Sequence, residues 1–480
     1  MTAIAAEPEP RRGAQFLILW LIPVLVAAVV SFAPVVLSDG DTFWHLATGG
    51  WILDHGQIPR TDPFSYTFAG RPWVTHEWLS EVVMAGAFRL AGWSGVMLVT
   101  GLSMGATAAV MARWLFRWLA PLSTVAALTL GVDCLASSVL ARPHIVALPV
   151  LALWTLAMLD ARRRGHAPSL WLLPLMALWA NLHSSFIVGV GLAAVFGLEA
   201  ALDRAAWRWR TVLGWAGFTF ASLAAALVTP HGFDGLAFPL KVMTMKTLPT
   251  ITEWSGPDFL RLDTMEVALL GGLFFLFWRG VRLSAVRAAL LLGLVHLTFQ
   301  HVRQEVLLGV IGPLIIAEPL GRALGPPAPP PPWRLFDPQL WPRTVLAISL
   351  LAGVIATRVA APVVRVDGGT APVSALAHVP AALRRAPVLN DYNFGGYLIF
   401  EGVKPYIDGR ADMYGDDFVA DYHLIESASQ SAMDHAITTY HVRWAILTPN
   451  RPLVAALDRT DGWQRLYADH YAVVFEKTRP

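Results

Sequence analysis

Charged residues and cysteine are scarce in this sequence. Only 15% of its 480 residues are charged, whereas 55% are hydrophobic. Soluble chains of this length carry a larger charged fraction, so the composition excludes an ordinary soluble enzyme. The net charge of +2 is too small to indicate a nucleic-acid partner. The single cysteine, Cys134, excludes an intramolecular disulfide and leaves the redox compartment undetermined.

A glycine-rich phosphate loop is missing from the C-terminal region as well. Neither G-x-G-x-x-G nor G-x-x-x-x-G-K occurs there. Such loops let backbone N–H groups approach a nucleotide phosphate, so nucleotide binding gains no support from this sequence.

Long apolar runs are abundant instead. They extend over about 16 to 24 residues, the length that crosses a bilayer as a helix. The first run follows Arg11 and Arg12, and no small-residue cleavage site ends it, so we interpret it as a retained signal anchor. The predicted spans are residues 14–37, 95–117, 121–140, 143–160, 169–182, 184–202, 211–228, 264–279, 286–300, 304–320 and 343–361.

Basic residues indicate how these spans are oriented, because connections rich in arginine stay in the cytoplasm. Whether segment 77–91 crosses the membrane sets which side every later connection faces. If this segment lies in the interface without crossing, all basic clusters fall on the inner side. Its polar side chains and its length of about 15 residues disfavour a crossing. We therefore predict about eleven spans. The basic clusters lie within residues 162–164, 204–210, 279–287 and 322–343.

This topology divides the chain into two parts. Residues 1–361 form a transmembrane module with a cytoplasmic N-terminus, and residues 362–480 form a periplasmic domain on a bacterial inner membrane. Two loops face outward, namely 38–94, which carries surface helices, and 229–263. The proline-rich segment 322–342 is a cytoplasmic linker that favours polyproline II. The predicted fold class is a polytopic α-helical membrane protein with a small C-terminal α/β domain.

The C-terminal part alternates between strand and helix signals, as small α/β domains do. This pattern differs from the apolar runs that precede it. We expect a strand, a glycine turn and a short helix within 387–400, a strand within 404–415, a helix at 416–440, a strand at 444–449, a helix at 452–458 and an edge strand at 471–477.

The sharpest chemical signal lies directly after the first span. Asp39 and Asp41 stand one residue apart at the start of the outer loop. Two carboxylates at this spacing can hold a divalent cation, or one of them can act as a general base on an acceptor group. The alternative is that they only cap the helix that follows.

Further along this loop, His76 and Glu77 open another helix. A His–Glu pair that faces Asp41 can bind a metal or a phosphate-bearing substrate, and His45 of the same loop is a further phosphate ligand. The tentative metal ligands are Asp41 and Glu77, with Mg²⁺ or Mn²⁺ as the cation. An ordinary helix cap remains the alternative for His76 and Glu77.

Three other outward turns carry basic side chains. Arginine suits a phosphate because its planar fork donates paired hydrogen bonds. If these turns converge, they form a phosphate-binding pocket; taken singly, each side chain is more often an interfacial anchor. The residues are Arg142 and His144, His183, and His301 and Arg303.

The C-terminal domain contains a polar segment, IDGRADMYGDD, at 407–417. Its Asp408, Arg410 and Asp412 are candidates for binding an acceptor, and a solvated turn is the alternative. Asp391 and Tyr392, in NDYNFGGYL at 390–398, are further candidates for acceptor binding.

These motifs resemble those of the GT-C glycosyltransferases. DTFWHLATGGWILDHG (41–56) is similar to the acidic first-loop motif of oligosaccharyltransferase catalytic subunits. THEWLSEVV (75–83) resembles the H-P-P-L segment of protein O-mannosyltransferases and of the aminoarabinose transferase. NDYNFGGYL, followed by IDGRADMYG, resembles the W-W-D-Y-G segment and the acidic motif of oligosaccharyltransferases, where the former serves acceptor recognition.

The resemblance implies a glycosyltransferase that uses a polyprenyl-phosphate or -diphosphate sugar, because sugar nucleotides do not occur outside the plasma membrane. The lipid tail would lie in a groove between spans, with its phosphate near Arg142, His144 and Arg303. Asp41 or Asp39 would deprotonate a glycan, lipid or protein acceptor, or hold the divalent cation.

Two other functions compete with this hypothesis. A transporter or flippase for lipid-linked sugars would carry its polar residues near the middle of the bilayer, whereas here they gather at one face. A non-catalytic scaffold for envelope polysaccharide assembly would keep the fold but would not need Asp39 and Asp41.

Overall fold

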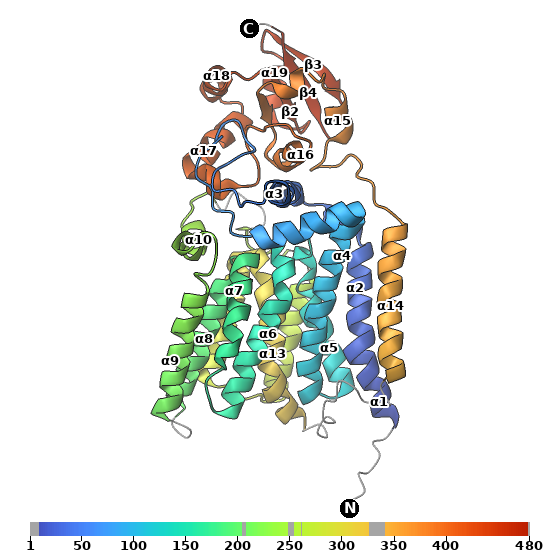
Figure 1. Ribbon diagram of the computed structural model, residues 1–480, viewed down its shortest axis with the longest axis vertical. Coiled ribbons are helices and arrows are strands. Elements are labelled where there is room, and N and C mark those ends of the chain that lie inside the picture. The colour runs from blue at the N-terminus through green and yellow to red at the C-terminus, as the bar shows by residue number, and fades with distance from the viewer. Residues whose placement is uncertain (1–8, 204–207, 248–253, 261, 326–340, 479–480) are drawn as a thin grey trace, which may run out of the picture.

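In the computed structural model, a helical bundle carries the chain's N-terminus at one end and the C-terminal domain at the other (Figure 1). Most of the proline-rich linker predicted at 322–342 lies outside the described residues. The structure describes residues 9–203, 208–247, 254–260, 262–325 and 341–478.

Among the described residues, six helices are long and apolar enough to cross a membrane, and four further apolar helices are shorter. This supports a membrane protein, while the number of about eleven crossings stays a prediction. The helices of the bundle are α1 (Glu9–Phe16), η1 (Leu17–Leu21), α2 (Ile22–Phe32), α4 (Trp78–Trp118), α5 (Pro121–Asp133), α6 (Pro143–Arg164), α7 (Leu173–Leu182), α8 (Phe186–Leu202), α9 (Trp209–Ala225), α11 (Thr264–Trp278), α12 (Ala285–Gln300), α13 (Glu305–Leu324) and α14 (Trp341–Ala360).

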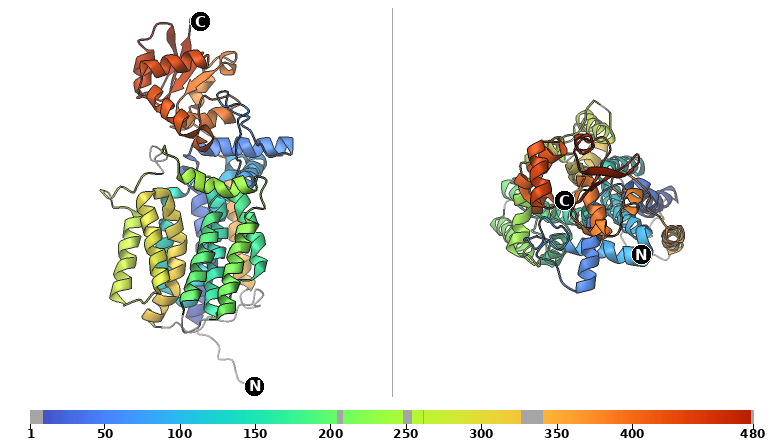
Figure 2. Two further views of the ribbon diagram at one scale, coloured as in Figure 1. Left: turned by 90° about the vertical axis from the view of Figure 1, so that its left-hand side faces the viewer. Right: turned by 90° about the horizontal axis from the view of Figure 1, so that it is seen from above.

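Two helical segments lie across the end of the bundle that carries the C-terminal domain (Figure 1). One is α3 (Asp41–His55), and the other is the first part of α4. Helix α4 bends at Ala91 and Gly92, where Gly92 has a φ of 57°, a conformation that favours glycine. The crosswise part of α4 covers most of segment 77–91. A further helix, α10 (Phe233–Met243), also lies at this end (Figure 2).

The two helices α2 and α4 pack closely because α4 presents glycine to its neighbour. A Cβ atom on Gly101 would lie 2.0 Å from Ser31 Oγ, and one on Gly105 would lie 2.8 Å from the Pro23 carbonyl oxygen. Small residues at this spacing let two helix backbones approach in a lipid environment, where packing replaces the hydrophobic effect.

The C-terminal domain contains a four-stranded sheet in the order β1-β2-β4-β3. Strand β1 pairs in parallel with β2, and the other two pairs are antiparallel. The domain's elements are α15 (Val373–Ala377), η8 (Leu383–Arg385), β1 (Val388–Asn390), η9 (Tyr392–Phe394), α16 (Gly395–Phe400), α17 (Ala411–Glu426), α18 (Gln430–Thr439), β2 (Trp444–Leu447), α19 (Pro452–Leu457), β3 (Trp463–Ala468) and β4 (Val473–Lys477).

Three local predictions for this domain were wrong. No strand forms within 404–415, because side chains of this stretch take part in a buried group of ion pairs that is described below. The helix predicted at 416–440 is two helices, separated near Ala428, whose φ is 61°. Strand β4 is central, since the partly exposed β3 forms the edge of the sheet. Strand β3 was not predicted, because its polar residues break the apolar alternation.

Candidate active site at the covered end of the bundle

The two acidic residues of the first loop share one arginine. Asp39 lies just before α3, Asp41 is its first residue, and Arg142 is the N-cap residue of α6. Arg142 Nη2 donates to Asp39 Oδ1 at 2.7 Å, and Arg142 Nε donates to the other oxygen of the same carboxylate. Asp41 Oδ2 lies 3.0 Å from Arg142 Nη2. The fold thus joins residues 103 positions apart into one charged group.

Within this group Asp39 is the more enclosed carboxylate. Its side chain is 9% exposed, and that of Asp41 is 24% exposed. Burial raises the pKa of Asp39, but the charge and hydrogen bonds of Arg142 outweigh it, so the net pKa is below 3.8. Asp39 therefore stays ionised and holds the guanidinium in place.

The C-terminal domain covers the carboxylates directly. A Cβ atom on Gly409 would lie 1.8 Å from Asp41 Oδ1, and one on Gly396 would lie 2.3 Å from the Gly40 carbonyl oxygen. Only glycine allows the two backbones to approach this closely. The outer loop and the C-terminal domain therefore meet at Asp41.

A second charged group surrounds Glu77. Its Oε1 lies 3.3 Å from His76 Nε2 and 3.2 Å from His183 Nε2, and its Oε2 lies 3.9 Å from His45 Nε2. His45 occurs one helical turn after Asp41 on α3, so the helix connects the two groups.

The three imidazoles differ in charge. Burial lowers the pKa of His45 and of His183 to about 3, so both are neutral at pH 7. The Ser185 N–H donates to His183 Nδ1, which leaves His183 Nε2 as the donor to Glu77. Burial also acts to lower the pKa of His76, but the carboxylate of Glu77 outweighs it and the net pKa is above 6.5.

Glu77 and His76 thus form the ion pair of this group. Burial raises the pKa of Glu77, but His76 and the other imidazoles outweigh it, so the net pKa lies well below 4.5. The His76 ring also stacks on Phe238 of α10, with ring centroids 3.8 Å apart. Phe238 therefore fixes the orientation of the only imidazole in this trio whose pKa is raised.

Some of the turns that were predicted to face outward come together near His183. The ring centroids of His144 and His183 are 6.0 Å apart, and the charge of Arg303 acts on His183. His144 Nε2 lies 2.9 Å from the Ser138 carbonyl oxygen. His301 instead donates from Nδ1 to the Trp254 carbonyl oxygen at 2.6 Å, so it anchors a loop. A phosphate-binding role for these side chains stays a prediction.

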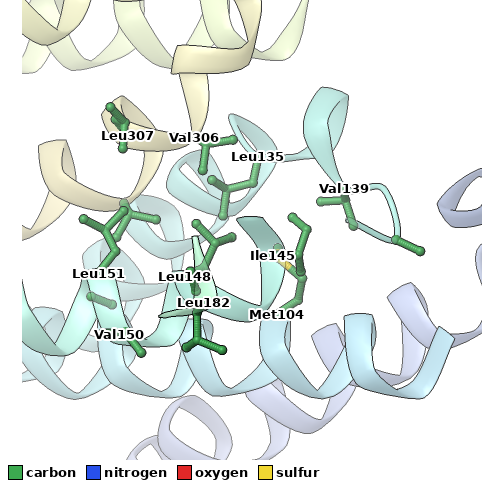
Figure 3. Close-up of a cluster of buried hydrophobic side chains, with 14 of the residues drawn as sticks. Met104, Leu135, Val139, Ile145, Leu148, Val150, Leu151, Leu182, Val306 and Leu307 are labelled. Carbon is green, nitrogen blue, oxygen red and sulfur yellow. The ribbon is translucent and has the colours of Figure 1, made fainter. Parts of the chain in front are cut away.

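Buried apolar side chains that neighbour these turns in sequence belong to one apolar layer of the core (Figure 3). Leu182 precedes His183 in sequence, and Ile145 follows His144. Burial of these side chains makes the surroundings of the turns less polar, which strengthens electrostatic interactions there. Other members of the layer are Met104, Leu135, Val139, Leu148, Val150, Leu151, Val306 and Leu307.

Comparison with solved structures identifies the fold. The chain matches the apo crystal structure of the oligosaccharyltransferase from Archaeoglobus fulgidus with a TM-score of 0.51 at 10% sequence identity. The match covers 90% of this chain and 69% of that one. The chain has the fold of an oligosaccharyltransferase. This likeness supports the predicted GT-C type of fold without selecting one of its subfamilies.

The same archaeal oligosaccharyltransferase, tethered through a disulfide bond to an acceptor peptide with the NVT sequon, matches with a TM-score of 0.46 at 11% identity. That match covers 89% of this chain and 68% of the other. No protein-family model matches the sequence. No curated protein matches it either.

Two of the predicted acceptor residues are inaccessible in this oligosaccharyltransferase fold. Arg410 and Asp408 have 0% exposed side chains. Arg410 Nη1 donates to Asp62 Oδ1 at 2.7 Å, and Arg410 Nη2 donates to Asp408 Oδ2 at 2.6 Å. Tyr414 Oη donates to Asp408 as well. The structure gives Asp408 and Arg410 contacts that join the C-terminal domain to the outer loop, and acceptor binding by these two residues stays a prediction.

The other predicted acceptor residues lie in different surroundings. Asp391 is buried and accepts from Thr448 Oγ1 at 2.7 Å and from Arg451 Nε at 3.2 Å, so it too is engaged within the domain. Tyr392 is partly buried beside it. Asp412 is different, because its charge acts on His76 of the first loop. Burial raises the pKa of Asp412.

A divalent cation does not fit the carboxylates as they stand. Both oxygens of Asp39 already accept from Arg142, and Oδ2 of Asp41 forms an ion pair with Arg142 Nη2 at 3.0 Å. Among the described residues, no group of three or more potential ligands has the arrangement for a metal. The guanidinium supplies the positive charge that a cation would bring to Asp39 and Asp41, so we route no chemistry through the metal predicted at Asp41 and Glu77.

Several residues of this site were not predicted. Glu81 Oε1 lies 3.0 Å from His45 Nδ1, and its Oε2 is buried without a hydrogen-bond partner. Its spacing of four from Glu77 places both on one helix face, a signal that was available in the sequence. Asp62 and Gly409 gave no such signal, because their partners come from distant parts of the chain.

Proposed function

We propose that this protein is a membrane glycosyltransferase of the GT-C type. It moves a sugar from a polyprenyl-phosphate or -diphosphate donor to a glycan, lipid or protein acceptor on the outer face of a bacterial inner membrane. The observation that carries the proposal is the group formed by Asp39, Asp41 and Arg142 where the bundle meets the C-terminal domain. The oligosaccharyltransferase fold supports it.

In this proposal Asp41 is the general base. It is the more exposed of the two carboxylates, and it sits where the outer loop and the C-terminal domain meet. Asp41 takes the acceptor's proton as the acceptor atom attacks the anomeric carbon. The bond between that carbon and the donor's phosphate oxygen breaks, and the phosphate leaves with the electron pair. A single base on the face opposite the leaving group implies inversion at the anomeric carbon.

Asp39 is a positioning residue. Both of its oxygens accept from Arg142, and its low pKa keeps it ionised. It thereby fixes the guanidinium that Asp41 shares, and the bidentate geometry keeps this cation oriented without motion during the reaction.

The leaving phosphate requires preorganised positive charge and N–H donors. We assign this role to His76, whose pKa is raised, and to Arg303. His144 and the neutral His45 and His183 would serve as further hydrogen-bonding groups or define the shape of the pocket. Glu77 raises the pKa of His76, which favours its protonated form, and accepts from His183, which sets the direction of both rings. Because His45 and His183 are neutral, their contribution is a dipole rather than a charge.

The test is the conversion of a labelled polyprenyl-phosphate sugar by the purified full-length protein, followed as release of the lipid phosphate. A general base contributes about 10²- to 10⁴-fold to a rate, so we expect Asp41→Asn to lose at least about 100-fold in turnover. Binding of the labelled donor should persist, because Asp41 is not assigned to it.

The matched control is Asp54→Asn. Asp54 lies on the same helix α3, is exposed, and pairs with Arg89 at 2.6 Å, away from Arg142. It should keep its turnover. Full activity of both Asp41→Asn and Asp39→Asn would remove the catalytic assignment. Binding of the donor without any turnover in the wild-type protein would favour a non-catalytic scaffold.

Metal dependence offers an independent test. Since Arg142 occupies the position between the two carboxylates, we expect turnover in excess EDTA to stay within about twofold of that in Mg²⁺ or Mn²⁺. Complete loss of activity in EDTA, restored by Mn²⁺, would show that Arg142 moves aside for a cation.

A further inference from the structure

Two arginines near the end of α14 have no acidic partner. Arg358 lies in the last turn of this helix, and Arg365 lies in the segment that leads to the C-terminal domain. Among the described residues, neither forms an ion pair with a carboxylate. By contrast, the enclosed Arg162 pairs with Glu199 at 3.2 Å, as expected for a guanidinium removed from water.

Arg365 lies between two aromatic rings. Its guanidinium carbon is 5.1 Å from the ring centroid of Phe43 and 5.2 Å from that of Trp93. Its Nε is buried and has no hydrogen-bond partner. Burial lowers the pKa of Arg365, and the only ionisable group found to oppose this is the phenol of Tyr397. A charge in such a place needs an anion to compensate its loss of hydration.

Arg358 repeats this arrangement on α14. It is 8% exposed, and its guanidinium carbon is 5.0 Å from the ring centroid of Phe32 on α2. One nitrogen, Nη2, donates to the Ala361 carbonyl oxygen, but Nε is buried without a partner. The chain thus carries two buried guanidinium nitrogens without hydrogen-bond partners, seven residues apart in the sequence, where α14 leads towards the C-terminal domain (Figure 1).

The surroundings of these arginines are apolar and exposed. Val364 and Val366, which flank Arg365, are 78% and 73% exposed. Helix α14 packs against α2, whose Leu25, Val29 and Phe32 form an exposed stripe at helical spacing. In a membrane protein, such a surface faces acyl chains. The unpaired cations therefore stand at the end of a lipid-facing surface.

We propose that Arg358 and Arg365 bind the phosphate of one anionic phospholipid, whose acyl chains lie along α2 and α14. Guanidinium groups form strong, directed hydrogen bonds to phosphate, and basic residues at the membrane surface attract anionic lipids. The occupant is a phospholipid rather than free phosphate because the apolar stripe continues directly from the cations. The site uses other residues than Asp41 and Arg142, and its proposed role does not depend on glycosyl transfer.

Native mass spectrometry of the detergent-purified full chain tests this site. The probes are dioleoyl phosphatidylglycerol, dioleoylglycerol, inorganic phosphate and undecaprenyl phosphate. We expect retention of one phosphatidylglycerol per chain, with binding reduced about tenfold or more in Arg365→Gln and in Arg358→Gln, since each loses a charge-assisted contact to phosphate. Arg365→Lys keeps the charge but lacks the planar guanidinium, so its phosphatidylglycerol binding should lie between that of the wild type and that of Arg365→Gln.

The matched control is Arg71→Gln. Arg71 also lies over an aromatic ring, 5.2 Å from the centroid of Phe68, but it is exposed on the outer loop. It should bind phosphatidylglycerol like the wild type, and thermal unfolding in the same detergent establishes that each variant is folded. If Arg365→Gln does not fold, the comparison rests on Arg365→Lys and Arg358→Gln.

Four outcomes overturn the proposal. The first is unchanged phosphatidylglycerol binding in these variants. The second is equal binding of dioleoylglycerol, which lacks the phosphate. The third is that inorganic phosphate binds as well as phosphatidylglycerol, which would make the site one for a free anion. The fourth is binding of undecaprenyl phosphate alone, which would make it part of the donor site.

Discussion

Replacing Arg410 by glutamine removes the cation between two buried carboxylates. The wild-type guanidinium donates to Asp62 at 2.7 Å and to both oxygens of Asp408 at 2.7 and 2.6 Å, and all three side chains are 0% exposed. Glutamine cannot neutralise these carboxylates, so the variant leaves uncompensated charge away from water. Breaking a buried ion pair in this way costs about 3–5 kcal/mol.

This cost falls on the contact between the outer loop and the C-terminal domain, because Asp62 belongs to the former and Asp408 to the latter. For a domain of this size, 1 kcal/mol corresponds to a shift of about 4–8 °C, so we expect the unfolding midpoint of Arg410→Gln to fall by about 12 °C or more. Thermal unfolding in detergent, combined with limited proteolysis of loop 56–77, measures the loss. Proteolysis should cut this loop faster in the variant, since Arg410 no longer holds it.

The control is Arg465→Gln in the same domain. Arg465 forms an exposed pair with Asp458 at 2.5 Å, and such surface pairs contribute less than about 1 kcal/mol. An Arg410→Gln protein that unfolds within about 2 °C of the wild type at pH 7 would refute the reasoning.

Three further predictions concern the site and the topology. Because the pKa of His76 is raised above 6.5 and that of Glu77 is lowered below 4.5, the stability lost in His76→Gln should be greatest between these values and should shrink as pH rises through the folded pKa of His76. Gly409→Ala should reduce turnover by roughly 100-fold, because its Cβ would meet Asp41 Oδ1 at 1.8 Å. A cysteine introduced at Arg163, in a Cys134-free background, should resist an impermeant thiol reagent applied from outside.

Each of these has its own control and its own contrary result. His435→Gln, on exposed α18, should show no such pH dependence, and a constant defect in His76→Gln would contradict the ion pair. Gly369→Ala should keep its turnover, because nothing lies within 4 Å of its Cβ position. If Gly409→Ala also kept its turnover, the contact between Gly409 and Asp41 would not be needed for activity. Ready labelling at position 163 from outside would invert the predicted topology.

Much of the architecture could be predicted from local sequence signals. Apolar runs and arginine-rich connections indicate the bundle, and alternating strand and helix signals indicate the C-terminal sheet, because burial in lipid or in a core imposes these patterns on neighbouring residues. Local errors arose where tertiary contacts override propensity. Residues 404–410 form a loop because Arg410 forms buried ion pairs with Asp408 and Asp62. No local sequence pattern predicts the contact with Asp62.

The candidate site shows the same division. The acidic character of the first loop and the basic character of the outward turns are visible in the chain itself, and so is the likeness of its motifs to those of GT-C enzymes. Which side chains are charged is not visible, because the low pKa of His45 and His183 results from burial by distant helices.

By itself, the sequence predicted a membrane bundle with a soluble domain, and it showed that carboxylates, imidazoles and arginines concentrate between its apolar runs. Only the tertiary structure decided that Arg142 lies between Asp39 and Asp41 and that Gly409 contacts Asp41. It also decided that the buried Arg410 pairs with Asp62 of the outer loop. The physical reason is that hydrophobic periodicity is a property of adjacent residues. Charge pairing depends on which distant residues the fold brings within a few ångströms and removes from water.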